Sequence, residues 1–290
     1  MRRFDTVLFD LDGTLLDTLE DICGAANHTL RELGYPERTL AEMRRFVGNG
    51  AEMQMRRSLG ADADEETVAK ALALYKPYYA AHCQIKTKPY AGVLELMAAL
   101  KAEGFRLAVV SNKPDEAVRP LVAEHFGALA DIAMGETAQR RRKPAPDMVN
   151  DALAALGADK SRAVYVGDSE VDIETARNAG IPCISVTWGF RDRESLAEAG
   201  ADALADTPEE LEKEVLRLSA GWDDFGGVTF GGGEPTLQAP ELLDCINRLK
   251  KHRIHTAIES NATTPEFPDV AREVDLAIAD LKAGTPEIFH

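Results

Sequence analysis

The first 218 residues alternate short apolar runs with amphipathic stretches. The apolar runs have the length of strands, and the stretches between them carry apolar residues at helical spacing. Strands that alternate with helices of this length predict an α/β fold with a doubly wound parallel sheet. The predicted strands are Thr6–Asp10, Arg106–Ser111, Ala130–Met134, Ala163–Val166 and Cys183–Val186, and the clearest helices are Val93–Glu103, Glu116–Phe126 and Asp147–Leu156.

One region after the first strand interrupts this alternation, because its pattern is helical throughout. Thr39 and Glu42 have the spacing of a capping box, which marks the start of a helix. A helical block between the first and second strands predicts an inserted cap over residues 17–86, with Lys86–Tyr90 as the return hinge. Three or more helices are predicted in the cap, over Leu19–Leu33, Leu40–Leu59 and Glu65–His82.

The pattern changes again at about residue 219. A glycine-dense stretch, Gly226–Pro235, precedes a predicted helix and two predicted strands. Glycine runs can bind phosphate, but the Gly-Lys-Ser/Thr of a P-loop is absent. The predicted elements are Pro240–His252, Ile254–Ile258 and Asp275–Ala279, and the predicted parts are a core of residues 1–16 and 87–218, the cap of residues 17–86, and a tail of residues 219–290.

Candidate chemistry begins where the first strand ends, at Asp10 and Asp12. The carboxyl ends of strands in an open α/β sheet are where ligands bind. Two neighbouring carboxylates are costly unless a cation or a proton separates their roles. Further polar residues follow later strands or lie in a polar loop, and all could meet at one edge of the sheet: Ser111, Asn112, Lys143, Asp168 and Asp172.

This set of residues suits phosphoryl transfer. Asp10 is the predicted nucleophile, which would form an aspartyl-phosphate, and Asp12 is the predicted general acid and base. Charge on the phosphoryl oxygens must be neutralised in such a reaction. Ser111, Asn112 and Lys143 are the predicted phosphate-binding residues.

A metal site is predicted beside the phosphate. Asp10, Asp168 and the main-chain oxygen of Asp12 offer hard oxygen ligands, which suit Mg²⁺. Asp172 is expected to orient either Lys143 or a metal-bound water.

Composition narrows the class of protein. The formal net charge is −16, so counterion release gives no attraction to nucleic acid, and we expect no nucleic-acid partner. No apolar run reaches the roughly 18 residues of a membrane span. The four cysteines are too far apart for a metal or redox motif. We therefore expect a soluble cytoplasmic protein without a membrane partner, whose oligomeric state stays open.

The motifs Asp10-Leu11-Asp12-Gly13-Thr14, Ser111-Asn112, Lys143-Pro144 and Gly167–Asp172 occur in this order. Over residues 3–218 the chain closely resembles the haloacid dehalogenase superfamily, and within it the phosphoglycolate phosphatases. The resemblance implies a Rossmann-like core, a helical cap and Mg²⁺-dependent phosphatase chemistry. Dehalogenases of the superfamily lack the second aspartate, so Asp12 argues against dehalogenation. Three cap residues are candidates for substrate specificity: Gly48, Asn49 and Gly50.

The tail resembles a different family, the radical S-adenosylmethionine activases of glycyl-radical enzymes. The matching segments are Gly227–Pro235, Glu259-Ser260-Asn261 and Asp280-Leu281-Lys282. That family holds its iron–sulfur cluster with a Cys-x3-Cys-x2-Cys triad, which this sequence lacks. We therefore expect a fragment of a (β/α) barrel, without radical activity and loosely ordered or weakly packed.

The leading hypothesis is a Mg²⁺-dependent phosphatase acting on a small phosphorylated metabolite, with 2-phosphoglycolate as the best single candidate. A sugar phosphomutase and a pyrophosphatase are alternatives on the same fold. An alternative of another class is a radical S-adenosylmethionine activase or a scaffold that uses the tail.

Overall fold

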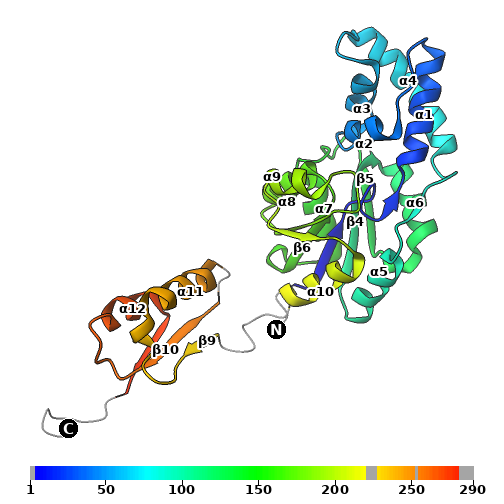
Figure 1. The fold of residues 1–290 in the computed structure, drawn as a ribbon. Coiled ribbons are helices and arrows are strands. Elements are labelled where there is room, and N and C mark those ends of the chain that lie inside the picture. The colour runs from blue at the N-terminus through cyan, green and yellow to red at the C-terminus, as the bar shows by residue number, and fades with distance from the viewer. Residues whose placement is uncertain (1–3, 220–226, 252–253, 281–290) are drawn as a thin grey trace, which may run out of the picture. The chain divides into compact units, whose positions relative to one another are not determined.

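The computed structural model describes residues 4–219, 227–251 and 254–280 (Figure 1). The chain forms two compact units, which divide between Ser219 and Ala220. In the described ranges, no helix is both long and apolar enough to cross a membrane.

A six-stranded parallel sheet forms the centre of the larger unit (Figure 1). The five strands predicted from the sequence are present, and the sixth, β8, is only three residues long. The parallel α/β architecture predicted for the core is therefore confirmed. In their order across the sheet, the strands are β5 (Ile132–Glu136), β4 (Arg106–Pro114), β1 (Thr6–Phe9), β6 (Ala163–Gly167), β7 (Cys183–Val186) and β8 (Ala203–Ala205).

Helices cover both faces of this sheet, as a doubly wound fold requires. Side chains alternate along β1, so Val7 and Phe9 join one apolar cluster and Leu8 joins the other. The first cluster includes side chains of α5 (Val93–Ala102), α6 (Asp115–Phe126) and α10 (Pro208–Ser219). The second includes side chains of α7 (Asp147–Leu156), α8 (Glu170–Ala179) and α9 (Arg193–Glu198).

The predicted cap is a group of helices with an apolar core of its own. The segment 40–59 forms two helices, which are divided where Val47 is extended and Gly48 has a φ of 113°. Thr39 and Glu42 form the predicted capping box. The cap helices are α1 (Leu19–Glu32), α2 (Leu40–Phe46), α3 (Gly50–Leu59) and α4 (Glu65–His82).

The cap joins the core through a small ladder that the sequence pattern did not predict. β2 (Leu16–Asp17) pairs antiparallel with β3 (Lys88–Pro89). The chain therefore leaves the core and returns to it at the same place. Asp21, at the start of α1, accepts main-chain hydrogen bonds from Lys86 and Thr87 at 2.8–3.1 Å, which secures the return segment.

The smaller unit contains a three-stranded parallel sheet in the order β11-β10-β9. Its strands alternate with helices and neighbour one another in chain order, which is the winding of a (β/α) barrel fragment. Its small apolar core includes Leu242, Ile246 and Ile258. The elements are β9 (Val228–Phe230), α11 (Ala239–Lys251), β10 (Thr256–Ser260), α12 (Phe267–Glu273) and β11 (Leu276–Ala279).

Candidate active site

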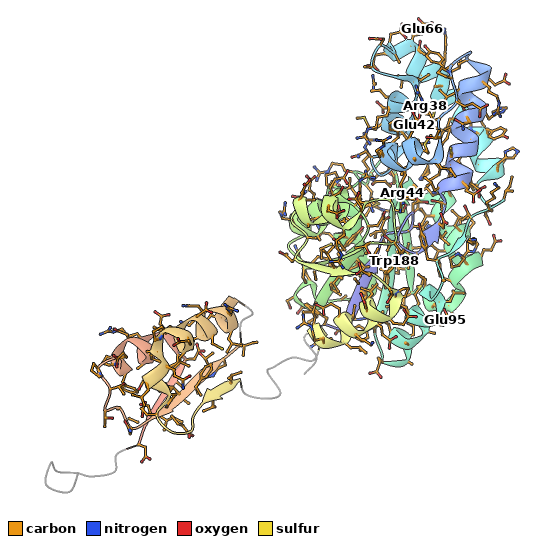
Figure 2. The ribbon with its side chains drawn as sticks, viewed as in Figure 1. Arg38, Glu42, Arg44, Glu66, Glu95 and Trp188 are labelled. Atoms are coloured by element: carbon orange, nitrogen blue, oxygen red, sulfur yellow. The ribbon has the colours of Figure 1, made fainter. Side chains whose placement is uncertain are left out.

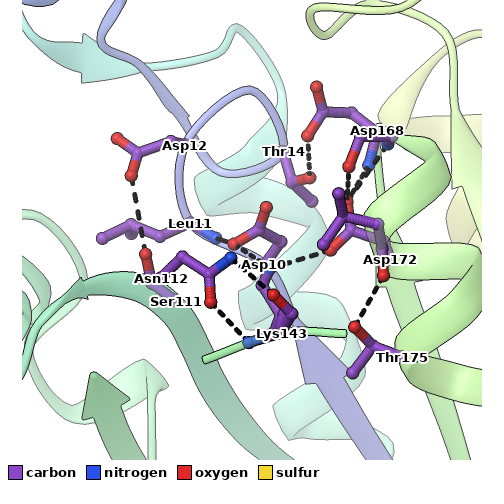
Figure 3. Close-up of polar contacts among 12 residues, drawn as sticks. Asp10, Leu11, Asp12, Thr14, Ser111, Asn112, Lys143, Asp168, Asp172 and Thr175 are labelled. Atoms are coloured by element: carbon purple, nitrogen blue, oxygen red, sulfur yellow. Dashed lines mark hydrogen bonds and ion pairs between the residues drawn. The ribbon is translucent and has the colours of Figure 1, made fainter. Parts of the chain in front are cut away.

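Neighbouring strands bring the predicted polar residues together. β1 lies between β4 and β6, so Asp10, Ser111 and Asp168 lie at the same edge of the sheet. Lys143 comes from the segment between β5 and α7 and reaches Asp10 (Figure 3). This is the carboxyl edge of the parallel strands, where ligands of such folds bind.

Asp10 is a buried carboxylate, and protein groups bind one of its two oxygens. Its Oδ1 accepts a hydrogen bond from the Leu11 N–H at 2.7 Å and forms an ion pair with Lys143 Nζ at 2.7 Å. Within the described ranges, no protein group hydrogen-bonds to its Oδ2. Burial raises the pKa of Asp10 well above its usual value, and the Lys143 ammonium only partly opposes this shift. The unoccupied oxygen can face phosphorus or a metal ion.

Lys143 is held as a buried ammonium. Its Nζ contacts Asp172 Oδ1 at 2.8 Å and the Tyr165 hydroxyl at 3.2 Å, in addition to Asp10. Burial alone would lower the pKa of Lys143, but the Asp10 and Asp172 carboxylates outweigh burial and raise it. The side chain therefore stays charged and directed at Asp10.

Asn112 holds the main chain of Lys143. Its Oδ1 accepts from the Lys143 N–H at 2.6 Å, and its Nδ2 donates to the Lys143 carbonyl at 3.1 Å. From the sequence, Asn112 is expected to bind the phosphate. In the structure, both ends of its amide contact the segment that carries Lys143.

Asp168 and Asp172 form the acidic side of the site. Asp168 accepts hydrogen bonds from Thr14 Oγ1 at 3.0 Å and from the Phe190 N–H at 2.7 Å. Burial raises the pKa of Asp168 to about 7, and the Asp172 carboxylate adds to the shift. The Oδ2 of Asp172 accepts from the Ser169 N–H and hydroxyl at 3.1 and 2.7 Å.

These acids fit a divalent cation. Asp10, Asp168 and Asp172 are all buried and offer oxygen atoms within 4.8 Å of one another. Asp172 already binds Lys143 and Ser169, so Asp10 and Asp168 are the better ligands. A cation beside them would offset the repulsion between buried carboxylates, and oxygen ligands suit Mg²⁺.

Asp12 lies in the turn after β1 and has a different environment. Its Oδ1 forms an ion pair with Lys113 Nζ at 2.5 Å, and its Oδ2 accepts from the Ser111 hydroxyl at 3.5 Å. Lys113 was not among the predicted site residues, because nothing in its local sequence pattern indicates that it meets Asp12.

Close backbone packing surrounds Asp168. Gly13 has a φ of 85°, and a Cβ there would lie 2.4 Å from Asp168 Oδ2. A Cβ on Gly189 would lie 2.3 Å from both the Gly13 carbonyl and Asp168 Cβ. Neither contact could be predicted from the sequence, since each depends on where the chain passes Asp168.

The cap and the core together line a cavity of about 510 Å³. Asp10, Asp12, Ser111 and Lys143 line it from the core. Gly48 and Gly50 line it from the cap, whereas Asn49 is not among the described lining residues. The cap also contributes three side chains that the sequence analysis did not select: Gln54, Tyr75 and Tyr79.

Two arginines connect the base of the cap to the core. Arg191, paired with Glu170 at 2.8 Å, donates to the main-chain carbonyls of Arg44 at 3.0 Å and Val47 at 3.1 Å. Arg44 donates to the Gly189 carbonyl. Figure 2 shows Arg44 at the lower end of the cap. These contacts hold the Gly48–Gly50 turn near the cavity.

In the smaller unit, Glu234 joins the glycine-rich segment to the end of β10. It accepts hydrogen bonds from the Ser260 hydroxyl at 2.6 Å and the Asn261 N–H at 2.8 Å. Burial raises the pKa of Glu234, but these bonds and those from Thr236 outweigh it and lower the pKa to about 2. Of the segments that resemble the activases, Leu281 and Lys282 lie outside the described residues.

Comparison with family models finds two matches. The Haloacid dehalogenase-like hydrolase model matches residues 7–186, and the Radical SAM superfamily model matches residues 197–288. Both resemblances expected from the sequence are therefore confirmed. The second match begins in α9 of the larger unit, before the boundary at residue 219 that the sequence pattern indicated.

Curated relatives of the larger unit are phosphoglycolate phosphatases. The protein from Pseudomonas putida is 34% identical over 190 residues, which are 63% of this chain and 70% of the relative. The protein from Rhodospirillum rubrum is 37% identical over 211 residues, which are 69% of this chain and 86% of the relative.

Solved structures agree with this assignment. A crystal structure from Lactobacillus delbrueckii subsp. bulgaricus, proposed as a phosphoglycolate phosphatase, is 39% identical with a TM-score of 0.72. It covers 74% of this chain and 99% of its own. CbbY from Rhodobacter sphaeroides, in complex with xylulose-(1,5)bisphosphate, is 26% identical with a TM-score of 0.57, over 72% of this chain and 96% of its own.

The fold, the cluster of acids around Lys143 and these relatives agree on a phosphoric monoester hydrolase. Over residues 7–186, the chain belongs to the haloacid dehalogenase-like hydrolases.

Proposed function

We propose that this phosphatase hydrolyses a small phosphomonoester, with 2-phosphoglycolate as the best candidate, through an aspartyl-phosphate on Asp10 and with Mg²⁺ as its cofactor. The observation that carries the proposal is the environment of Asp10. This buried carboxylate lines the cavity with one oxygen that no described residue hydrogen-bonds and the other paired with Lys143 at 2.7 Å.

In the first step, Asp10 attacks phosphorus and forms a new P–O bond as the ester P–O bond breaks. Asp12 carries a proton in the substrate complex and gives it to the departing alkoxide. Lys143 and the Ser111 hydroxyl bind the phosphoryl oxygens, whose charge must be balanced as the bond changes.

In the second step, Asp12 takes a proton from the water that attacks the phosphorus of the aspartyl-phosphate. The bond to Asp10 breaks, phosphate leaves, and both carboxyl groups return to their starting forms. Mg²⁺, when bound, neutralises charge on the phosphoryl group. Asp10, Asp168 and the main-chain oxygen of Asp12 would hold it.

The assay is phosphate release by the full chain on a panel of phosphomonoesters that includes 2-phosphoglycolate, with Mg²⁺ and with a chelator. We expect turnover that requires the metal, highest activity on 2-phosphoglycolate, and loss of activity in an Asp10→Asn variant. Asp159→Asn is the matched control, since Asp159 only caps a short turn outside the site, at Ser161.

The result also separates the alternatives. Isomerised product that requires a bisphosphate primer would indicate a phosphomutase, and release from pyrophosphate alone would indicate a pyrophosphatase. Full turnover by Asp10→Asn would refute the nucleophile. Absence of turnover on every substrate, both by the chain and by residues 1–218 alone, would refute the phosphatase.

A further inference from the structure

The cavity has a second polar region beside the proposed phosphate site. It combines Lys113 of β4 with Gln54 of α3 and Tyr79 of α4, and all three residues line the cavity. A continuous series of contacts joins them to Asp12. Lys113 Nζ lies 2.5 Å from Asp12 Oδ1 and 5.2 Å from the centre of the Tyr79 ring, and the Tyr79 ring stacks on Tyr75 at 5.4 Å.

Two groups in this region are buried donors without protein partners. Among the described residues, neither Gln54 Nε2 nor the Tyr79 hydroxyl has a hydrogen-bond partner. The Tyr75 hydroxyl donates to Gln54 Oε1 at 3.4 Å, which leaves the amide nitrogen of Gln54 as the free end. Only 4% of Gln54 is exposed. Buried donors without partners are rare in folded proteins, so they indicate a ligand that accepts hydrogen bonds.

Lys113 supplies positive charge at the same place. Its side chain is only 7% exposed, and Asp12 is its one ion-pair partner within the described ranges. An ammonium group has three donors, so bonding to Asp12 leaves capacity for another acceptor. The main chain here is fixed by β5, because a Cβ on Gly135 would lie 2.5 Å from the Lys113 carbonyl.

We propose that Lys113, the Gln54 amide and the Tyr79 hydroxyl bind a carboxylate on the substrate. They would so select phosphorylated short-chain acids over phosphomonoesters that lack a carboxylate. This inference rests on the proposed function and identifies its substrate class. A carboxylate is acceptor-only and anionic, which matches three donors of which one is charged.

The position of Lys113 limits the length of the substrate. Asp12, its partner, is the group that gives a proton to the leaving oxygen. The carboxylate is therefore bound within one or two bonds of that oxygen. A carboxylate one carbon from the ester oxygen, as in 2-phosphoglycolate, meets this requirement, whereas the second phosphate of a pentulose 1,5-bisphosphate lies much farther away.

The test compares 2-phosphoglycolate with ethyl phosphate, in which a methyl group replaces the carboxylate. The variants are Tyr79→Phe, Gln54→Met and Lys113→Met. We expect Tyr79→Phe and Gln54→Met to raise KM for 2-phosphoglycolate about tenfold with little change in kcat, because they remove donors to the substrate. KM for ethyl phosphate should change less than about threefold, since that substrate never used these donors.

Lys113→Met should lower kcat/KM for 2-phosphoglycolate by about 100-fold or more relative to its effect on ethyl phosphate. The quantity to compare is the ratio of kcat/KM for 2-phosphoglycolate to kcat/KM for ethyl phosphate, because losing the contact with Asp12 lowers kcat for both substrates alike. Lys70→Met is the control, since this surface lysine of α4 pairs with the exposed Glu66 and should leave the ratio of the two kcat/KM values unchanged.

Wild-type hydrolysis of both substrates together with an unchanged ratio in all three variants would overturn the inference and leave the phosphatase standing. A wild-type preference for xylulose 1,5-bisphosphate over 2-phosphoglycolate would overturn it as well. If the wild type hydrolyses no phosphomonoester, the proposed function fails first and the inference falls with it. If Lys113→Met does not fold, Tyr79→Phe still decides, because the Tyr79 hydroxyl has no hydrogen-bond partner among the described residues to lose.

Discussion

Replacing Asp172 with asparagine removes the buried anion that orients Lys143. Asp172 is fully buried, and its two oxygens accept from five groups, among them Lys143 Nζ at 2.8 Å and the Ser169 hydroxyl at 2.7 Å. An asparagine amide has one oxygen and one nitrogen. In either orientation its NH₂ group faces donors: Lys143 and Tyr165 on one side, or Ser169 on the other.

The size of the effect follows from burial. Removing one partner of a buried ion pair costs about 3–5 kcal/mol, because the other charge is left uncompensated. Lys143 keeps its ion pair with Asp10 at 2.7 Å, which favours the lower end of this energy range. The hydrogen bonds lost at Asp172 favour the upper end. We therefore expect the free energy of unfolding of the larger unit to fall by about 3–5 kcal/mol. The thermal midpoint should fall by roughly 6–20 °C.

The chain offers a local probe for this measurement. It contains two tryptophans, and the Trp188 indole N–H donates to the Thr14 carbonyl at 3.0 Å, next to the site. In a Trp222→Phe background, urea unfolding followed by tryptophan fluorescence reports on the larger unit alone. Glu66→Gln is the control, because the exposed pair between Glu66 and Lys70 should have little effect on the midpoint (Figure 2 labels Glu66).

Equal midpoints for Asp172→Asn and Glu66→Gln would refute this reasoning, since the buried pair would then contribute no more than an exposed one. A Lys143→Met/Asp172→Asn double variant checks the cause. If the incompletely neutralised Lys143 ammonium is responsible, removing it as well should add less destabilisation than Lys143→Met causes alone.

Three other outcomes follow from the structure. Gly189→Ala should lower activity at least about tenfold by displacing Asp168, and it should destabilise the larger unit by about 1–3 kcal/mol through overpacking. Gly24→Ala is the control, because nothing lies within 4 Å of the added Cβ. Equal activities of the two variants would refute the packing argument. In a thiol titration of the native protein, Cys245 should react first and give a fast phase, because it is exposed. The other three cysteines are buried, and burial raises their pKa values. A Cys245→Ser variant that keeps the fast phase would contradict this prediction. Arg191→Ala should raise KM by about three- to tenfold through loosening the contact between cap and core, with an unchanged KM as the opposing result.

Most of the fold could be predicted from the sequence, because the core strands are long enough and apolar enough to show their pattern. Leu8 and its neighbours form a run that is buried on both faces, as in parallel sheets generally. The return hinge was predicted at Lys86–Tyr90, but the pairing of Lys88–Pro89 with Leu16–Asp17 was missed, since two residues carry no periodicity.

The site residues that follow strands could be predicted, because the end of a strand can be located in the chain. Asp10, Asp168 and Lys143 meet as a parallel sheet requires. Lys113 was missed because its partner Asp12 is 101 residues away, and no local pattern encodes such a pair. Asn112 lies at the predicted place, but which group its amide contacts depends on the path of the Lys143 segment.

The central place of β1 determines the order in which a growing chain can fold. Thr6 of β1 is aligned with Arg106 of β4 and with Ala163 of β6, so both neighbours of the first strand are synthesised long after it. The buried apolar residues of the cap core lie between residues 22 and 75, with Phe190 as the exception. We expect the cap to form on the ribosome while β1 still lacks its partners. The proposed nucleophile is thus made among the first residues of the protein and set in place among the last.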